Sequence, residues 1–307
     1  MRSPIDPPPR TAQARFAADF GQRFLITVEI GEAFERAQSR THDTSEPIDV
    51  ARIARFQRLC EAEGVAPVYL ADGTIARSAE LADMLRGPLA AGKAEIGIQL
   101  RPALNPPAGR ERAELLALRT EIVRNFGSAP VIYRAVGRGA GALAAATPRD
   151  SGIGAGSPAL PHFDDTSSGG RDDRRHPIAP YWADATHSVL QLPLTSVFWG
   201  LLRRQGEWLD PLLAPVPRLH GALARLGLLQ RIALTCPGIS VEEAIRGIDI
   251  ALDDGLPLLV FAFDCSLRDA DGALQRFHDW WTRVFAYLEL RAVRPTTVRD
   301  VLRAAER

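Results

Sequence analysis

Hydrophobic residues along the chain follow two alternating patterns, short continuous runs and helical spacing. The continuous runs have strand length and are typical of strands buried on both faces of a parallel sheet. They lie at 23–29, 65–70, 94–100, 131–134, 189–192 and 258–263. Between them, apolar residues recur every three or four positions, as at Ile53, Phe56 and Cys60, which predicts helices that cover the sheet. Repeated βα units favour a parallel sheet, closed or open.

Capping signals predict where several helices begin. Ser78 is a residue type favoured at the N-cap, and residues 240–243 read Ser-Val-Glu-Glu, a capping-box pattern. A Trp-rich helix is predicted over about 273–288, and its aromatic spacing indicates a stripe facing the core. A final helix is predicted after Thr297.

Two segments show neither pattern of hydrophobic residues. Residues 1–20 are rich in proline and lack apolar periodicity, which predicts a flexible arm, either disordered or loosely docked. Residues 147–179 hold many Gly, Ser, Asp and Pro residues, which predicts a long loop over one mouth of the sheet, functional or ornamental. We therefore expect one folded domain over 21–307.

The composition narrows the class of protein. The 307 residues are 46% hydrophobic and carry 37 basic and 37 acidic side chains, a formal net charge of zero. This balance gives no electrostatic reason to expect a nucleic acid or a membrane surface as partner. The apolar runs are too short to span a bilayer, and residues 1–10 lack the apolar centre of a secretion signal. Three scattered cysteines fit a reducing compartment, so we expect a cytoplasmic protein.

Polar residues stand at the carboxyl ends of the predicted strands, where parallel α/β folds place their sites. Glu29 ends the first strand, and Gln99 and Arg101 lie at the end of the third. Arg134 ends the fourth strand and Asp264 the last. These five residues are the candidate site.

The order of several short motifs resembles the polysaccharide deacetylase (NodB-type) family. The motifs span about 22–304 and include Phe-Leu-Ile-Thr-Val, Glu-Ile-Gly, Arg-Ala, Ala-Pro-Tyr-Trp and Leu-Pro-Leu-Thr-Ser. The resemblance implies a single-domain, distorted and incomplete (β/α) barrel. It also implies an amide hydrolase in which one carboxylate and two histidines hold a divalent metal such as zinc.

The resemblance also implies roles for the strand-end residues. Glu29 stands where the family has its base aspartate, Arg134 where an arginine orients a catalytic carboxylate, and Asp264 where a histidine is the general acid. Gln99 and Arg101 stand at the two candidate metal positions. A guanidinium stays protonated and cannot ligate a metal, so we expect no metal cofactor here. Arg101 is predicted to pair with Asp264 or Glu29 and to fill the space of the metal.

The first functional hypothesis is a catalytically degenerate protein of the deacetylase fold. Its remodelled pocket would bind a carbohydrate, another sugar-containing ligand or a partner protein. Gln99 and Arg101 would contact the ligand, and the aromatic pair Tyr181 and Trp182 could stack on a sugar ring.

Two other hypotheses belong to different classes. One is an active hydrolase of carbon–nitrogen bonds with a noncanonical site built on Glu29, Asp264 and the nearby Glu32. The other is a scaffold without a ligand. Turnover that vanishes on Glu29→Gln would separate the first of these from the degenerate protein.

Overall fold

The computed structural model describes residues 12–30, 49–100, 110–135, 151–157, 160–164, 172–213, 216–236, 238–264 and 273–306. The strands are β1 (Arg23–Glu29), β2 (Val68–Ala71), β3 (Glu95–Leu100), β4 (Ile132–Ala135), β5 (Ala155–Gly156), β6 (Tyr181–Trp182), β7 (Leu190–Gln191), β8 (Ser196–Trp199), β9 (Gln230–Ala233), β10 (Thr235–Cys236), β11 (Leu258–Asp264) and β12 (Arg294–Pro295). The helices are α1 (Val50–Ala62), α2 (Gly73–Ala76), α3 (Ala79–Ala90), α4 (Arg110–Phe126), α6 (Gly206–Leu213), α7 (Pro217–Arg225), α8 (Val241–Asp253), α9 (Ala273–Leu290) and α10 (Val298–Ala304), with a 3₁₀ turn η5 (Arg203–Gln205).

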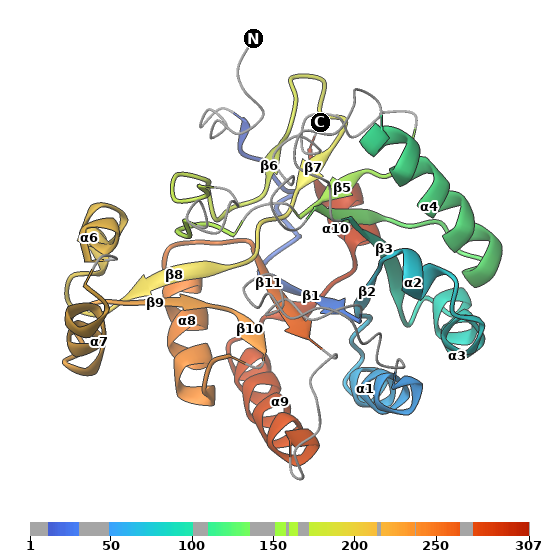
Figure 1. Ribbon diagram of the computed structural model, residues 1–307. Coiled ribbons are helices and arrows are strands. Elements are labelled where there is room, and N and C mark those ends of the chain that lie inside the picture. The colour runs from blue at the N-terminus through green and yellow to red at the C-terminus, as the bar shows by residue number, and fades with distance from the viewer. Residues whose placement is uncertain are drawn as a thin grey trace.

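Ten strands form one curled sheet, which Figure 1 shows at the centre of the molecule. Their order is β10-β11-β1-β2-β3-β4-β5-β7-β6, and β12 pairs with the start of β1. The pairs along this path are parallel except that of β6 with β7. Within the described residues the edge strands β10 and β6 do not pair with each other. The single-domain, incomplete (β/α) barrel predicted from the sequence is confirmed.

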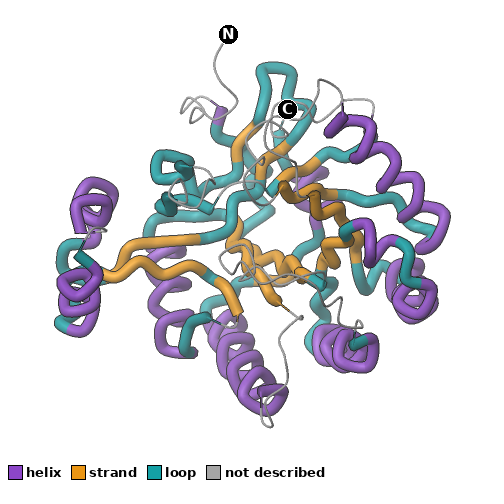
Figure 2. Tube along the Cα trace, in the orientation of Figure 1, coloured by secondary structure: helices purple, strands orange, loops and turns teal. Residues whose placement is uncertain are grey.

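Alternating side chains along β1 separate two hydrophobic cores. Phe24 and Ile26 point outward into the larger core, to which α1, α3, α4, α8 and α9 contribute. Figure 2 shows these helices around the outside of the sheet. Leu25 points inward into a smaller core, where Val298 and Val301 of α10 also lie. Helix α10 therefore fills part of the barrel interior.

A buried carboxylate holds α10 in place. Glu95, the first residue of β3, is 1% exposed and accepts the backbone N–H groups of Val298 and Arg299 at 2.6 and 3.2 Å. Burial raises the pKa of Glu95 above its ordinary value, and the two backbone hydrogen bonds partly oppose this. The contact places α10 at the amino ends of the strands, opposite the end that carries the candidate residues.

The predicted helix starts are confirmed. Ser78 caps α3 by accepting the N–H of Leu81, and Ser240 forms a capping box with Glu243 at the start of α8. Thr297 caps α10. None of the described helices combines the length and the apolar character needed to cross a membrane.

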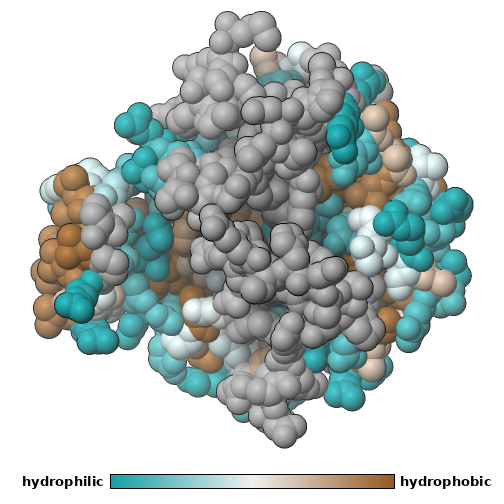
Figure 3. All heavy atoms as spheres, in the orientation of Figure 1, coloured by the Kyte–Doolittle hydropathy of each residue, from teal (hydrophilic) through white to brown (hydrophobic). Residues whose placement is uncertain are grey.

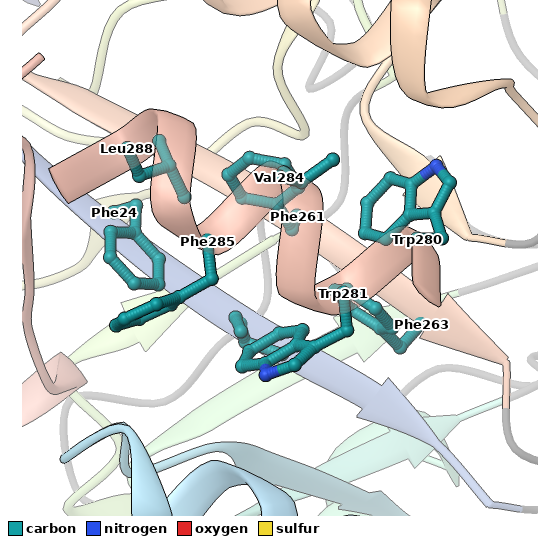
Figure 4. A pocket seen from close by; sticks show the side chains of 9 residues that line it. Phe24, Phe261, Phe263, Trp280, Trp281, Val284, Phe285 and Leu288 are labelled. Carbon is teal, nitrogen blue, oxygen red and sulfur yellow. The ribbon is translucent and has the colours of Figure 1, made fainter. Parts of the chain in front are cut away.

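The Trp-rich helix α9 packs aromatic side chains onto β1 and β11, as Figure 4 shows. The ring of Trp281 lies 5.7 Å from Phe263 and 5.8 Å from Phe285, and Phe285 lies 6.1 Å from Phe24. A void of about 10 Å³ remains among these rings, at the lower limit of the space that could hold one water. Trp280 and Trp281 are both buried, which confirms the predicted core-facing stripe.

Of the two forms predicted for the flexible arm over 1–20, disordered or loosely docked, the structure shows the docked one for residues 12–20. Ala14 donates its N–H to the carbonyl of Pro180 at 2.9 Å. Phe20 stacks on Phe16 with ring centroids 4.5 Å apart, and both Ala14 and Phe20 belong to the inner core. Residues 12–20 are therefore docked because they bury apolar side chains that the proline-rich composition masked, while 1–11 lie outside the described residues.

The two ends of the described chain lie side by side. Glu306 donates its N–H to the carbonyl of Arg15 at 2.9 Å, and Ala17 donates to Ala304 at 3.2 Å. Phe16 and Ala305 form an antiparallel bridge between the same two segments. The N-terminal segment thus packs against the end of α10.

The long loop predicted over 147–179 also needs correction, because part of it enters the sheet. Residues 155–156 form β5 between β4 and β7. A Cβ at Gly156 would lie 2.6 Å from Gln191 Oε1 and 2.8 Å from the ring of Tyr133, so glycine lets these side chains approach. A strand of two small residues gives no periodic signal. Residues 136–150, 158–159 and 165–171 lie outside the described part of the chain.

An element that the sequence did not predict projects from the barrel. Strands β8 and β9 form an antiparallel hairpin with α6 and α7 at its tip, at the left of Figure 1, and we call residues 196–233 the lobe. Its own small core consists of Phe198, Leu213 and Leu229. Arg231 donates to Asp210 Oδ2 at 3.0 Å and to the carbonyl of His162 at 2.8 Å. Burial and the cation of Arg231 lower the pKa of His162 to about 4.

Candidate functional site

Four of the five candidate residues lie at the carboxyl ends of four strands. In the sheet register Glu29 of β1 lies beside Asp264 of β11, and Gln99 of β3 lies beside Arg134 of β4. A flat sheet would separate β1 from β4 by about 14 Å, three strand spacings. The side chains of Glu29 and Arg134 nevertheless touch, so the curl of the sheet closes the site across the barrel interior.

The central contact is a buried ion pair. Arg134 Nη1 donates to Glu29 Oε1 at 2.8 Å, and both side chains are 7% exposed. Arg134 Nη2 donates to Thr27 Oγ1 at 2.8 Å and to Ser157 Oγ at 3.2 Å. Thr27 in turn donates its hydroxyl to the carbonyl of Phe261 at 2.9 Å. The guanidinium is therefore fixed on three sides, and its charge is matched by one carboxylate.

Gln99 contacts the other oxygen of the same carboxylate. Its Nε2 lies 3.4 Å from Glu29 Oε2, and the side chain is 2% exposed. Turning the amide over would bring Oε1 against a carboxylate oxygen, which is repulsive, so the observed orientation is the favourable one. Gln99 Oε1 then has no hydrogen-bond partner within the described part of the chain. The site thus presents a buried acceptor without a described hydrogen-bond partner, next to a carboxylate whose charge is balanced by Arg134.

Asp264 and Arg101 complete the predicted set. Asp264 is half-buried at the end of β11, in register with Glu29. Arg101 and Glu32 lie outside the described residues, so the predicted pairing of Arg101 stays a prediction. The cation that the structure places against Glu29 is Arg134, the position for which the resemblance implied a carboxylate-orienting role.

Solved structures identify the fold. A protein from Mycobacterium smegmatis assigned as a polysaccharide deacetylase matches with a TM-score of 0.56 and 14% identity, over 97% of this chain and 94% of that chain. A protein from Pseudomonas aeruginosa PAO1 with the same assignment matches with a TM-score of 0.51 and 14% identity, over 96% and 93%. The chain has the polysaccharide deacetylase fold.

A matching structure with a different enzyme name shares this fold. Puue allantoinase matches with a TM-score of 0.56 and 15% identity, over 99% of this chain and 96% of that chain. No family model matches the sequence, and no curated protein matches it significantly. The TM-scores above 0.5 establish the deacetylase fold, whereas sequence identities of 14–15% leave the activity open.

The described donors of this deacetylase-fold site do not fit a zinc centre. Within the described ranges no group of three or more His, Cys, Asp or Glu side chains could hold a metal ion. Both oxygens of Glu29 already face N–H donors, from Arg134 and Gln99. A zinc site needs several unprotonated donors around one point, and here a fixed guanidinium occupies that neighbourhood.

Tyr181 and Trp182 do not join the site. They form the edge strand β6 and are 6% and 4% exposed. Trp182 stacks on His187 with centroids 4.9 Å apart and belongs to the inner core. Such buried rings have too little exposed surface to stack on a sugar, so the structure does not support the predicted platform. The burial arises because Tyr181–Trp182 pairs with β7 rather than ending a loop.

Two site residues escaped the sequence analysis. Thr27 lies two positions before Glu29, hence on the same inward face of β1, and this period of two could have identified it. Ser157 follows the short strand β5 inside a segment that read as a loop, and no local signal marked it. Both hydroxyls bind Arg134, which makes them part of the support of the ion pair.

Proposed function

We propose that the protein uses its deacetylase fold to bind a carbohydrate or another sugar-containing ligand without metal-dependent hydrolysis. One observation carries the proposal: the carboxylate of Glu29 is held by Arg134 on one oxygen and faces the amide of Gln99 on the other. A carboxylate engaged in this way is a weak candidate for a metal ligand or for the base that activates water.

The chemistry of the pocket favours a ligand that donates hydrogen bonds. Gln99 Oε1 is a buried acceptor without a described partner, and leaving such an atom unpaired costs about 1–3 kcal/mol. A sugar hydroxyl or an amide N–H would satisfy it. The half-buried Asp264 lies at the same end of the barrel, in register with Glu29.

Ligand binding tests this proposal. Chitooligosaccharides and other glycans would be screened by calorimetry against the full chain and against Gln99→Leu, with thermal unfolding to verify that the variant is folded. We expect binding that falls at least tenfold in Gln99→Leu, since one hydrogen bond in a buried site contributes about 1.4 kcal/mol or more. Equal affinity of both chains would contradict a role of Gln99, and binding of a protein instead of any glycan would replace the ligand class.

Metal titration tests the second half of the proposal. Calorimetry with Zn²⁺, Co²⁺ and Ni²⁺ is expected to show no stoichiometric binding at millimolar metal. Stoichiometric binding that disappears in Asp264→Asn would overturn the metal-free site. A cytoplasmic location belongs to the same proposal, and it rests on three cysteines scattered through the sequence, of which Cys60 and Cys236 are buried.

The alternative is an active hydrolase of carbon–nitrogen bonds. The register of Glu29 beside Asp264 favours it, because two neighbouring carboxyl groups can divide the roles of base and acid. Release of acetate or of an amine from a glycan or related amide would be assayed on the full chain. Turnover that is lost in both Glu29→Gln and Asp264→Asn would establish the hydrolase and contradict the hypothesis of a catalytically degenerate protein.

A further inference from the structure

Large apolar side chains are exposed on the lobe. Eight large hydrophobic residues are exposed in the described chain, and six of them fall within 201–226. The six are Leu201, Trp208, Leu212, Val216, Leu219 and Leu226, between 47% and 81% exposed. Figure 3 shows apolar surface gathered over α6 and α7. The other two, Val123 and Leu290, lie on α4 and α9.

Four of the exposed residues lie on two short helices or at a helix end, while Leu201 lies in the turn before η5 and Val216 is the N-cap of α7. Trp208 and Leu212 are four positions apart on α6, and Leu219 and Leu226 are seven positions apart on α7 and its C-cap, so each pair shares a face. The opposite sides of these helices pack onto the small core of the lobe. The lobe therefore has a second apolar side that no described residue covers, and contiguous exposed surface of this kind marks an interaction site.

The charges around this side are mostly positive. Arg204, Arg218 and Arg225 are exposed and make no ion pair within the described ranges. Glu207 is exposed, whereas Asp210 is buried against Arg231. The chain as a whole has no net charge, so the positive character is local to the lobe.

We propose that the lobe binds the surface of a membrane that contains anionic lipids. Short amphipathic helices with Trp and Leu on one side and arginines beside them lie in the plane of a membrane and bury the apolar side at the headgroup boundary. The arginines would meet lipid phosphates while their aliphatic stems stay against the apolar layer.

The charges decide between this occupant and a second copy of the chain. A two-fold contact through α6 and α7 would set this surface against its own copy, whose exposed charges are also mostly positive. An anionic lipid surface instead complements them. The zero net charge of the sequence gave no reason to expect a membrane surface, because an average over 307 residues hides the three exposed arginines of the lobe, which make no ion pair within the described residues and stand beside a single exposed carboxylate, Glu207.

Vesicle flotation with the full-length protein tests the proposal. Vesicles of phosphatidylcholine alone would be compared with vesicles that also contain phosphatidylglycerol. We expect binding to the second kind, weakened by salt, with a blue shift of Trp208 fluorescence that is lost in Trp208→Phe. Binding should fall at least about tenfold in Leu212→Ser/Leu219→Ser and in Arg218→Gln/Arg225→Gln.

Matched changes elsewhere on the surface are the controls. Val123→Ser/Leu290→Ser removes the exposed apolar residues outside the lobe, and Arg55→Gln/Arg58→Gln removes two exposed arginines of α1. Both are expected to bind vesicles like the unchanged chain. No flotation with either vesicle, or equal loss in test and control variants, would overturn the proposal. A dimer in sedimentation experiments that Leu212→Ser/Leu219→Ser dissociates would overturn it too, by assigning this side to a second copy.

Discussion

At the scale of single residues, the pair of Glu29 and Arg134 dominates the site. Two charges at 7% exposure have lost most of their hydration, and each stabilises the other only while both are present. Thr27 and Ser157 hold the guanidinium in place from the side away from the carboxylate. The pair is therefore a structural requirement of the barrel interior as well as a feature of the candidate site.

Removal of the cation should be strongly destabilising. We expect Arg134→Met to lower the free energy of unfolding by about 3–5 kcal/mol, because it leaves the carboxylate of Glu29 buried without a partner charge. The double variant Glu29→Met/Arg134→Met should recover much of this loss. Urea unfolding of the three chains measures both effects.

An exposed ion pair provides the control for this experiment. Arg303 and Asp300 form an ion pair at 2.8 Å on α10, with side chains 75% and 53% exposed. Arg303→Met should cost less than about 1 kcal/mol, since exposed pairs contribute little. A cost for Arg134→Met as small as that of Arg303→Met would mean that water reaches Glu29.

Most residues of the candidate site could be predicted from the sequence, but the contacts between them could not. Glu29 and Arg134 stood out because a charged residue ends an apolar run. The resemblance implied that Arg134 orients a carboxylate, but nothing local shows which side chain lies across a curled sheet, and the predicted pairing of Arg101 stays a prediction. Ser157 was missed since its place depends on a strand of two residues.

At the scale of elements, the anchoring of α10 by Glu95 makes stability depend on pH. Burial raises the pKa of this carboxyl above 4.5, so the folded chain holds the proton more tightly than the unfolded chain. The resulting stabilisation is fully present below the unfolded pKa and is lost as the pH rises through the folded pKa.

A comparison with Glu95→Gln measures this dependence. The variant loses a hydrogen-bond acceptor at every pH, but it does not titrate. We expect the stability of the unchanged chain relative to Glu95→Gln to be higher near pH 4 than near pH 7, by denaturant unfolding at both. A difference that stays constant or grows with pH would contradict the direction of the shift.

The packing of α9 gives a prediction about core volume. Phe285 lies against Phe24 and Trp281 beside a void of about 10 Å³ (Figure 4). Phe285→Ala should lower the free energy of unfolding by about 3–5 kcal/mol, because it enlarges a cavity that rigid rings cannot close. Leu290→Ala, at a position 77% exposed on the same helix, should change it by no more than about 0.5 kcal/mol. Urea unfolding compares the two.

Elements were predictable where they were long and periodic. The capping box at Ser240 and the stripe of α9 follow from local chemistry alone. The lobe was not predicted, because β8 has four residues, α6 eight and α7 nine, too few for a clear period along the chain.

At the scale of the whole molecule, the barrel interior is sealed by α10 and by the N-terminal segment. Phe20 contributes to the inner core although it lies in a segment predicted to be flexible. Phe20→Ala is expected to lower the free energy of unfolding by about 3–5 kcal/mol, measured by urea denaturation. The nearby exposed Arg15 is the control: Arg15→Ala should have little effect. If Phe20→Ala and Arg15→Ala both changed the free energy of unfolding only slightly, the docking of this segment would contribute little to stability.

The overall order of βα units could be predicted from the sequence, and so could the fold that it implies. The degree of closure could not, because the count of strands does not determine the curl, and β5, β6 and β10 are two residues long. Net charge also failed as a guide at this scale, since the cations of the lobe are balanced by acids elsewhere.

The adjacent chain ends have a consequence for topology. Arg15 and Glu306 are joined by a backbone hydrogen bond, so a short peptide linker could connect the segments around them into a continuous backbone. The order of elements in such a circularly permuted chain could start at an exposed turn, such as Gly92, without breaking a strand. In a fully cyclised chain the unfolded state would lose conformational freedom, and the barrel would unfold at a higher temperature. The linear order of this protein is thus one of several that its architecture could accept.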